Sequence, residues 1–109
     1  MSQFIYIKQV FIVFLIALGS IAPSFAHNPI CECFDNADGT ITCEGGFSDG
    51  STAAGIPLRV RDSNGRILID AMMSERSEYT FDRPAGRFRV EFDAGDGHVI
   101  RIDGRDIEE

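Results

Sequence analysis

The sequence predicts an all-β protein, a small antiparallel β sandwich preceded by a cleaved signal peptide. Three observations predict this fold. Apolar and polar residues alternate over short runs, and turn residues rich in Gly, Asn and Asp recur about every ten residues. No segment of helix length shows a 3.6-residue hydrophobic period. About six or seven short strands of this kind are typical of a sandwich.

Residues 1–26 have the three parts of a secretory signal peptide. Lys8 precedes the apolar run Val10–Ala22, and Ser24-Phe25-Ala26 places small residues before the expected cleavage site. We therefore expect cleavage after Ala26 and a periplasmic or otherwise exported protein that begins at His27. The alternative is a retained membrane anchor, which is disfavoured because the apolar run is shorter than the roughly 20 residues that a span requires.

The expected mature chain is strongly acidic. The full chain has a net charge of −7, and loss of Lys8, its only lysine, with the signal peptide changes this to −8 (−7 − 1). Such a balance disfavours nucleic acid as a partner and favours a cation. Because so short a domain buries only a modest core, a disulfide or a bound metal would add stability.

The mature chain divides into two segments. Residues 27–50 form a cysteine-bearing N-terminal hairpin and a connector, and the connector begins at Glu44, where periodicity is lost. Residues 51–109 form the sandwich body, which ends in an acidic tail from Gly104 to Glu109. Neither segment contains an internal repeat.

The cysteine hairpin is predicted to turn at Ala37-Asp38-Gly39. We expect a type I turn on Ala37-Asp38 with Gly39 in the left-handed region, which places Asn36 opposite Thr40. Counting along the ladder then places Cys33 opposite Cys43. The two-residue period of a strand puts Cys31 on the same face, so all three thiols share one side of the hairpin.

A second hairpin is predicted around Asn64-Gly65, a strong signal for a two-residue type I′ turn. This loop pairs Val60 with Ile69 and Leu58 with Ala71, so that apolar side chains meet.

The segment from Tyr79 to His98 has the densest alternation in the chain. Two half-buried strands are joined by a turn at residues 83–86, where Pro84 fixes its own φ and Gly86 permits a positive φ. The loop Asp93–His98 presents the histidine, and Val99–Ile102 forms a last strand. The apolar face contains Tyr79, Phe81, Phe88, Val90 and Phe92. The solvated face contains Arg87, Arg89, Glu91 and Asp93, and we expect cross-strand pairs for Arg87, Arg89 and Glu91.

Several motifs of residues 55–102 resemble prealbumin-like, carboxypeptidase-regulatory-like modules, which have an immunoglobulin-like sandwich fold. They include Ile56-Pro57-Leu58, Tyr79-Thr80-Phe81 and Pro84-Ala85-Gly86. The ending Asp93-Ala94-Gly95-Asp96-Gly97-His98 resembles that of small exported accessory components of energy-coupling-factor nickel and cobalt transporters. This resemblance implies nickel or cobalt as the metal and a membrane transporter component as the partner.

The candidate metal ligands are all the histidines and cysteines of the chain. Imidazole and thiolate are the donors that nickel, cobalt, copper and zinc prefer. For the cysteines the alternative is one disulfide, formed by Cys43 with either Cys33 or Cys31, which is the ordinary use of cysteine in an exported protein. For His98 the alternative is a hydrogen bond to a carboxylate such as Asp96. The full candidate set is His27, His98, Cys31, Cys33 and Cys43.

A histidine at the mature N-terminus is a chelator in its own right. It carries an α-amine that titrates near pH ~8 and an imidazole that titrates near ~6.5, so both can bind a metal near neutrality. The alternative is that signal peptidase leaves His27 there without a role. No set of Ser, His and Asp has catalytic context, so we expect no enzymatic activity. The sequence thus favours an exported metal-binding accessory protein, and its alternative is a structural or interaction module with one disulfide and no metal.

Overall fold

A computed structural model describes residues 28–109, so the expected signal peptide and His27 lie outside the described residues. The described part has seven strands and one 3₁₀ helix and lacks any helix long and apolar enough to cross a membrane. The elements are β1 (Pro29–Asp35), β2 (Thr40–Phe47), β3 (Pro57–Asp62), β4 (Ile67–Met72), β5 (Glu78–Asp82), β6 (Phe88–Asp93), β7 (Val99–Asp103) and η1 (Gly104–Asp106).

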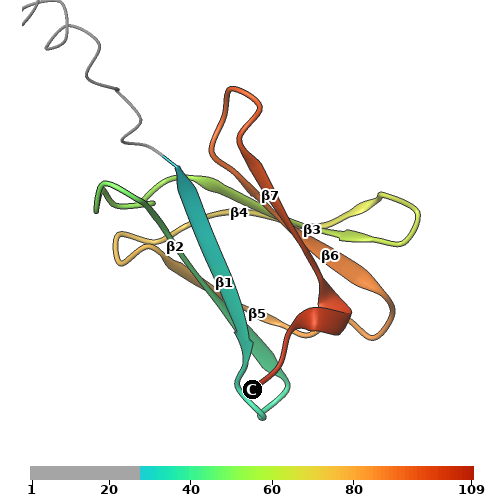
Figure 1. The fold of residues 1–109 in the computed structure, drawn as a ribbon. Helices are drawn as coiled ribbons and strands as arrows, with labels where there is room; N and C mark the ends of the chain where they lie inside the picture. Colours follow the sequence, from blue (N-terminus) through green and yellow to red (C-terminus); the bar gives the residue numbers. More distant parts are fainter. Residues whose placement is uncertain (1–27) are drawn as a thin grey trace, which may run out of the picture.

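The strands form two antiparallel sheets that pack face to face (Figure 1). One sheet has the order β1-β2-β5 and the other has the order β4-β3-β6-β7. The predicted all-β sandwich is therefore confirmed. The cysteine hairpin is an integral part of it, because β2 pairs with β5.

The chain crosses from one sheet to the other between β5 and β6. The turn predicted at residues 83–86 is therefore a connection between sheets and does not close a hairpin. Gly86 does not have a positive φ, so this turn does not use the left-handed conformation that a glycine permits. The crossing allows Phe81 of β5 and Phe88 of β6 to meet edge to face across the interior, with ring centroids 6.5 Å apart.

The core contains the face that alternation predicted. Phe81, Phe88, Val90 and Phe92 are buried, and Tyr79 is half-buried against them. Because side chains alternate across a strand, these residues of β5 and β6 all point between the sheets. They pack with fully buried residues from β2 and β3, namely Ile41, Cys43, Leu58 and Val60.

The predicted registers are confirmed, but both hairpin loops differ in detail. Val60 pairs with Ile69 as predicted, yet the Asp62 N–H donates to the Arg66 carbonyl at 2.9 Å, so the β3–β4 loop has three residues. A register shift between Val60 and Arg61 absorbs the extra residue. The two-residue type I′ loop was therefore the wrong prediction, although the pairing that it implied is correct.

The β1–β2 loop closes where predicted, with the Asn36 N–H donating to the Thr40 carbonyl at 3.0 Å. Gly39 has the predicted positive φ of 92°. Ala37 has a φ of 60°, which excludes the predicted type I turn. The Asp35 carboxylate explains the difference, because it accepts a hydrogen bond from the Ala37 N–H at 2.8 Å and bends the backbone locally.

Strand β2 is longer than predicted. The sequence assigns the connector from Glu44 onward, but pairing continues to Phe47, opposite Pro29. Gly45 in this extension lies flat against the core, since a Cβ there would come 2.7 Å from Cε2 of Phe92. Glycine has no side chain to mark a strand face, and for this reason alternation is lost where the strand continues.

The C-terminal residues pack on the body, although the sequence predicts an acidic tail. After η1, the Ile107 side chain is buried. The Glu108 carbonyl accepts a hydrogen bond from the Asp35 N–H at 2.8 Å, which ties the last residues to the edge of β1.

Candidate functional site

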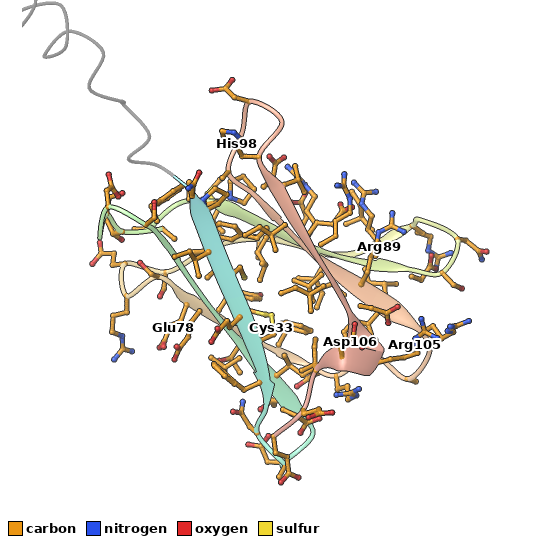
Figure 2. All side chains as sticks on the ribbon, viewed as in Figure 1. Cys33, Glu78, Arg89, His98, Arg105 and Asp106 are labelled. Atoms are coloured by element: carbon orange, nitrogen blue, oxygen red, sulfur yellow. A yellow bond between two sulfur atoms is a disulfide. The ribbon has the colours of Figure 1, made fainter. Side chains whose placement is uncertain are left out.

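Strands β1 and β7 are edge strands of different sheets that lie side by side and begin at the same end of the sandwich (Figure 1). The β6–β7 loop lies at this end and carries His98 (Figure 2). The described chain also begins here, at Asn28. The topology therefore brings the entry of the chain into β1 and the histidine loop to one end of the molecule.

The backbone of the β6–β7 loop is strongly curved. The Ala94 N–H donates to the His98 carbonyl at 3.0 Å, and the His98 N–H donates to the Gly95 carbonyl at 2.8 Å. Gly95, Asp96 and Gly97 have positive φ values of 82°, 50° and 78°. Glycine and aspartate tolerate this region, which accounts for the Gly-Asp-Gly run before the histidine.

The side chain of His98 is exposed at the mouth of this loop. Within residues 28–109 its imidazole makes no hydrogen bond, and the expected alternative, a bond to Asp96, is not formed. Asp93 at the base of the loop is engaged, because its carboxylate pairs with Arg59 at 3.0 Å and accepts from the Gly95 N–H at 3.0 Å. The imidazole nitrogens of His98 thus face solvent.

Asn28 fixes the position at which the chain enters β1. Its N–H donates to Oγ of Ser48 at 3.1 Å, and its carbonyl accepts from the Ser48 N–H at 2.9 Å. The other predicted donor of this end, His27, precedes Asn28 in the sequence and lies outside the described residues.

The cysteines are not gathered at the His98 end. Cys33 and Cys43 form a disulfide across the hairpin, so neither sulfur is a thiolate in this form. Cys31 is the free thiol and is half-buried on the same, inner face, as predicted. Burial, with a smaller contribution from Glu32, raises the pKa of the Cys31 thiol to about 12. Of the alternatives left open by the sequence, the structure shows one disulfide and one leftover thiol.

No group of three or more His, Cys, Asp or Glu side chains within residues 28–109 is arranged to hold a metal ion. Among the predicted ligands in the described part, only the imidazole of His98 is exposed to solvent. The three cysteines lie in or against the core.

The outer face of β6 differs from the solvated strand face that the sequence predicts. Glu91 is only 7% exposed, and its carboxylate contacts Arg61 at 2.6 Å, Arg89 at 3.3 Å and Arg101 at 3.4 Å. Burial acts to raise the pKa of Glu91, but the hydrogen bonds and charges of Arg61 and Arg89 outweigh it and lower that pKa. Cross-strand pairs on this face were expected, and Glu91 pairs with Arg61 of β3 and Arg101 of β7. The burial of Glu91 depends on three strands together, so sequence periodicity alone did not reveal it.

The outer face of the three-stranded sheet carries a row of like charges. Glu32 of β1 lies directly opposite Glu44 of β2, and Glu44 lies directly opposite Glu78 of β5. Exposed apolar side chains, Ile30 and Phe34, flank this row on β1. Directly opposed like charges are destabilising in a sheet, so this face is not optimised for stability.

The chain was compared with known proteins at three levels, and no protein-family model, curated protein or solved structure matches it. The fold and the geometry described above are therefore the basis for the functional proposal.

Proposed function

We propose that the protein is an exported transition-metal-binding accessory protein of nickel or cobalt uptake, whose metal donors are the N-terminal residue His27 and the loop residue His98. One observation carries the proposal: β1 and β7 begin at the same end, so Asn28 and His98 lie at that end together (Figures 1 and 2). His27 is the residue immediately before Asn28 in the sequence.

The chemistry of the donors supports this assignment. A mature N-terminal histidine offers an α-amine and an imidazole, and His98 adds an imidazole that is exposed and without a hydrogen bond in the described part of the chain. Nitrogen donors of this kind suit nickel and cobalt, and copper or zinc would also bind. The net charge of −7 favours the approach of a cation.

The disulfide supports export, because such bonds form and persist in oxidising compartments. In this proposal Cys33 and Cys43 stabilise the hairpin, and Cys31 is a buried thiol and not an auxiliary ligand. The partner that would receive the metal is a membrane transporter component, as the resemblance of the histidine loop implies. No enzymatic activity forms part of the proposal.

The proposal is tested by changing the α-amine without changing any side chain. One glycine added before His27 converts the amine to an amide, a far poorer donor at neutral pH. Calorimetric titration with Ni(II) should give one-to-one binding for the protein that begins at His27, a loss of most affinity for the extended protein, and a smaller loss for His98→Ala. A protein with the glycine added after Glu109 is the matched control. Equal affinity of the N-terminally extended and unextended proteins would refute the N-terminal site.

A second candidate is an interaction module with one disulfide and no metal. The row of Glu32, Glu44 and Glu78 favours it, because a face that keeps opposed carboxylates beside exposed Ile30 and Phe34 is suited to a basic partner. The titration above separates the two candidates. If no variant binds Ni(II), Co(II) or Cu(II), the interaction module becomes the better assignment.

A further inference from the structure

A pocket of about 370 Å³ opens between the β5–β6 connection and η1. Its walls carry three arginines, Arg83, Arg87 and Arg105, and its lining contains no acidic residue. The remaining lining is the ring of Phe88, Gly104 and the small residues 84–86. The charged side chains of the lining are thus all cationic, although the whole chain has a net charge of −7.

Two of the arginines make contacts that hold their side chains in place, and each pairs with an aspartate outside the pocket lining. Arg83 donates to the Asp35 carboxylate at 2.7 Å and to the Gly104 carbonyl at 3.1 Å, and its Cζ lies 5.5 Å from the centroid of the Phe88 ring. Each guanidinium has five N–H donors, so Arg83 retains donors for another acceptor.

Arg105 is fixed in the same manner by Asp103. Its Nη2 and Nε donate to the two carboxylate oxygens at 2.9 and 3.3 Å, and hydrogen bonding from Arg105 lowers the pKa of Asp103 to about 2. Asp103 is therefore ionised near neutrality and pairs with Arg105 at the surface, where the two side chains are 43% and 67% exposed. Such fixed arginines lose less conformational entropy when they bind an anion.

Arg87 is the third arginine of the lining and is exposed. Within residues 28–109 it makes no direct hydrogen bond or ion pair, although its charge helps to lower the pKa of Asp103. The N–H groups of Ala85 and Gly86 beside it donate no hydrogen bond. A Cβ on Gly86 would meet nothing within 4 Å, so the connection leaves space around these donors. The pocket thus combines two arginines in ion pairs with one that makes no direct hydrogen bond or ion pair in the described part of the chain.

The ring of Phe88 supplies the floor. It is only 6% exposed, and Gly104 packs directly on it, since a Cβ at Gly104 would lie 2.6 Å from its Cε1 atom. A glycine at position 104 is therefore required for η1 to approach β6 closely enough to form the pocket wall. The pocket depends on the same aromatic residue that joins the two sheets.

We propose that this pocket binds an oxyanion, a carboxylate or phosphate group carried by a small molecule. Arg87 is its principal contact, and Arg83 and Arg105 contribute their remaining N–H donors, because guanidinium groups match the geometry of such oxygens. The site is separate from the proposed metal donors, since His98 and Arg105 lie at different ends of the sandwich (Figure 2).

The test is an NMR titration of ¹⁵N-labelled protein at low ionic strength with two probes, inorganic phosphate and citrate. Saturable amide shifts should be confined to residues 83–88 and 104–106. Arg87→Gln should weaken binding about fivefold or more, equivalent to about 1 kcal/mol. Arg76→Gln is the matched control, because this substitution removes the same charge from a different loop, where Arg76 is 87% exposed. This control should change the affinity less than twofold, as expected for a distant surface charge.

The relative affinity for the two probes distinguishes the two kinds of oxyanion. Tighter binding of citrate indicates a carboxylate ligand, and tighter binding of phosphate indicates a phosphorylated ligand. Equal weakening by Arg87→Gln and Arg76→Gln would show nonspecific attraction and overturn the proposal. So would shifts spread over the arginines of β3 and β6, or the absence of a saturable shift at millimolar probe. None of these results depends on metal binding at His98.

Discussion

The Cα atoms of Cys33 and Cys43 lie 4.0 Å apart on neighbouring strands, and their sulfurs form the disulfide of the β1–β2 hairpin. The third cysteine, Cys31, is left as a thiol whose pKa is raised to about 12, mainly by burial. Because the thiolate is the reactive form, Cys31 should react slowly in the folded protein.

We therefore predict that the exported protein takes up one alkyl group per chain, and takes it up at least about tenfold faster in denaturant than in buffer at pH 8. Intact mass spectrometry after timed alkylation measures both the number and the rate, and it also identifies the new N-terminus. Three alkylatable thiols in protein recovered without reductant would show that the disulfide is wrong.

The second prediction concerns Phe88, which contacts Phe81, Gly104 and Arg83. Truncation to alanine removes a ring that joins both sheets, so Phe88→Ala should lower the free energy of unfolding by about 3–5 kcal/mol. Phe34→Ala is the control, because Phe34 is 37% exposed on an outer face and should cost less than about 1 kcal/mol. Chemical denaturation measures both, and a similar cost for the two variants would mean that the strand faces are misassigned.

The third prediction compares two adjacent glycines of β2. A Cβ at position 45 would lie 2.7 Å from Cε2 of the fully buried Phe92, whereas at position 46 the nearest atom, a backbone oxygen, is 3.9 Å away. Gly45→Ala should therefore destabilise the protein by about 1–3 kcal/mol through overpacking. Gly46→Ala should be nearly neutral. Thermal unfolding that ranks the two variants in the opposite order would contradict the packing of β2 on β6.

The fourth prediction concerns acid stability. Interaction with Arg61 and Arg89 overcomes the effect of burial, so the pKa of Glu91 is below its unfolded value of about 4.5. A carboxylate with a depressed pKa contributes stability above its unfolded pKa, and this contribution is lost as the pH falls through the folded-state pKa. Glu91→Gln should thus cost about 2 kcal/mol near neutrality. It should also reduce the loss of stability below about pH 4.5.

The control for Glu91 is Asp70→Asn. Asp70 pairs with Arg59 at 3.5 Å, but its side chain is 64% exposed, so the change should cost less than about 1 kcal/mol. Urea denaturation between pH 3 and 7 distinguishes the two variants. If the stability of Glu91→Gln falls as steeply at acid pH as that of the unchanged protein, Glu91 does not titrate as described.

Local pattern was sufficient to predict the sandwich and the pairings within two hairpins, β1–β2 and β3–β4. The position of the Ala37-Asp38-Gly39 loop set Cys33 opposite Cys43, and the apolar pairs set Val60 opposite Ile69. Both pairings join residues that are close together in the sequence. The predicted loop gave the register of the first hairpin, whereas in the second a bulge offset the wrong loop length and kept the pairing. The two loop conformations were less predictable, because they depend on a carboxylate cap at Asp35 and on a bulge beside Val60.

The features that the sequence did not reveal depend on long-range packing. Alternation gives the same pattern for a hairpin and for a crossing between sheets, so it could not show that β5 and β6 separate. The burial of Glu91 depends on arginines of three strands. For the candidate site, the loop around His98 was predicted, whereas its proximity to the start of β1 follows from the strand order and direction.

The proposed metal site is tested most directly by paramagnetic broadening in an NMR spectrum of the protein that begins at His27. Substoichiometric Cu(II) should broaden the amide signals of Asn28 to Ile30 and of Ala94 to Val99 together, because both stretches lie at the end where β1 and β7 begin. The signals of the distant loop at residues 62–66 should remain sharp. Broadening limited to the first residues, or centred on the acidic loop at residues 35–38, would contradict a site shared by His27 and His98.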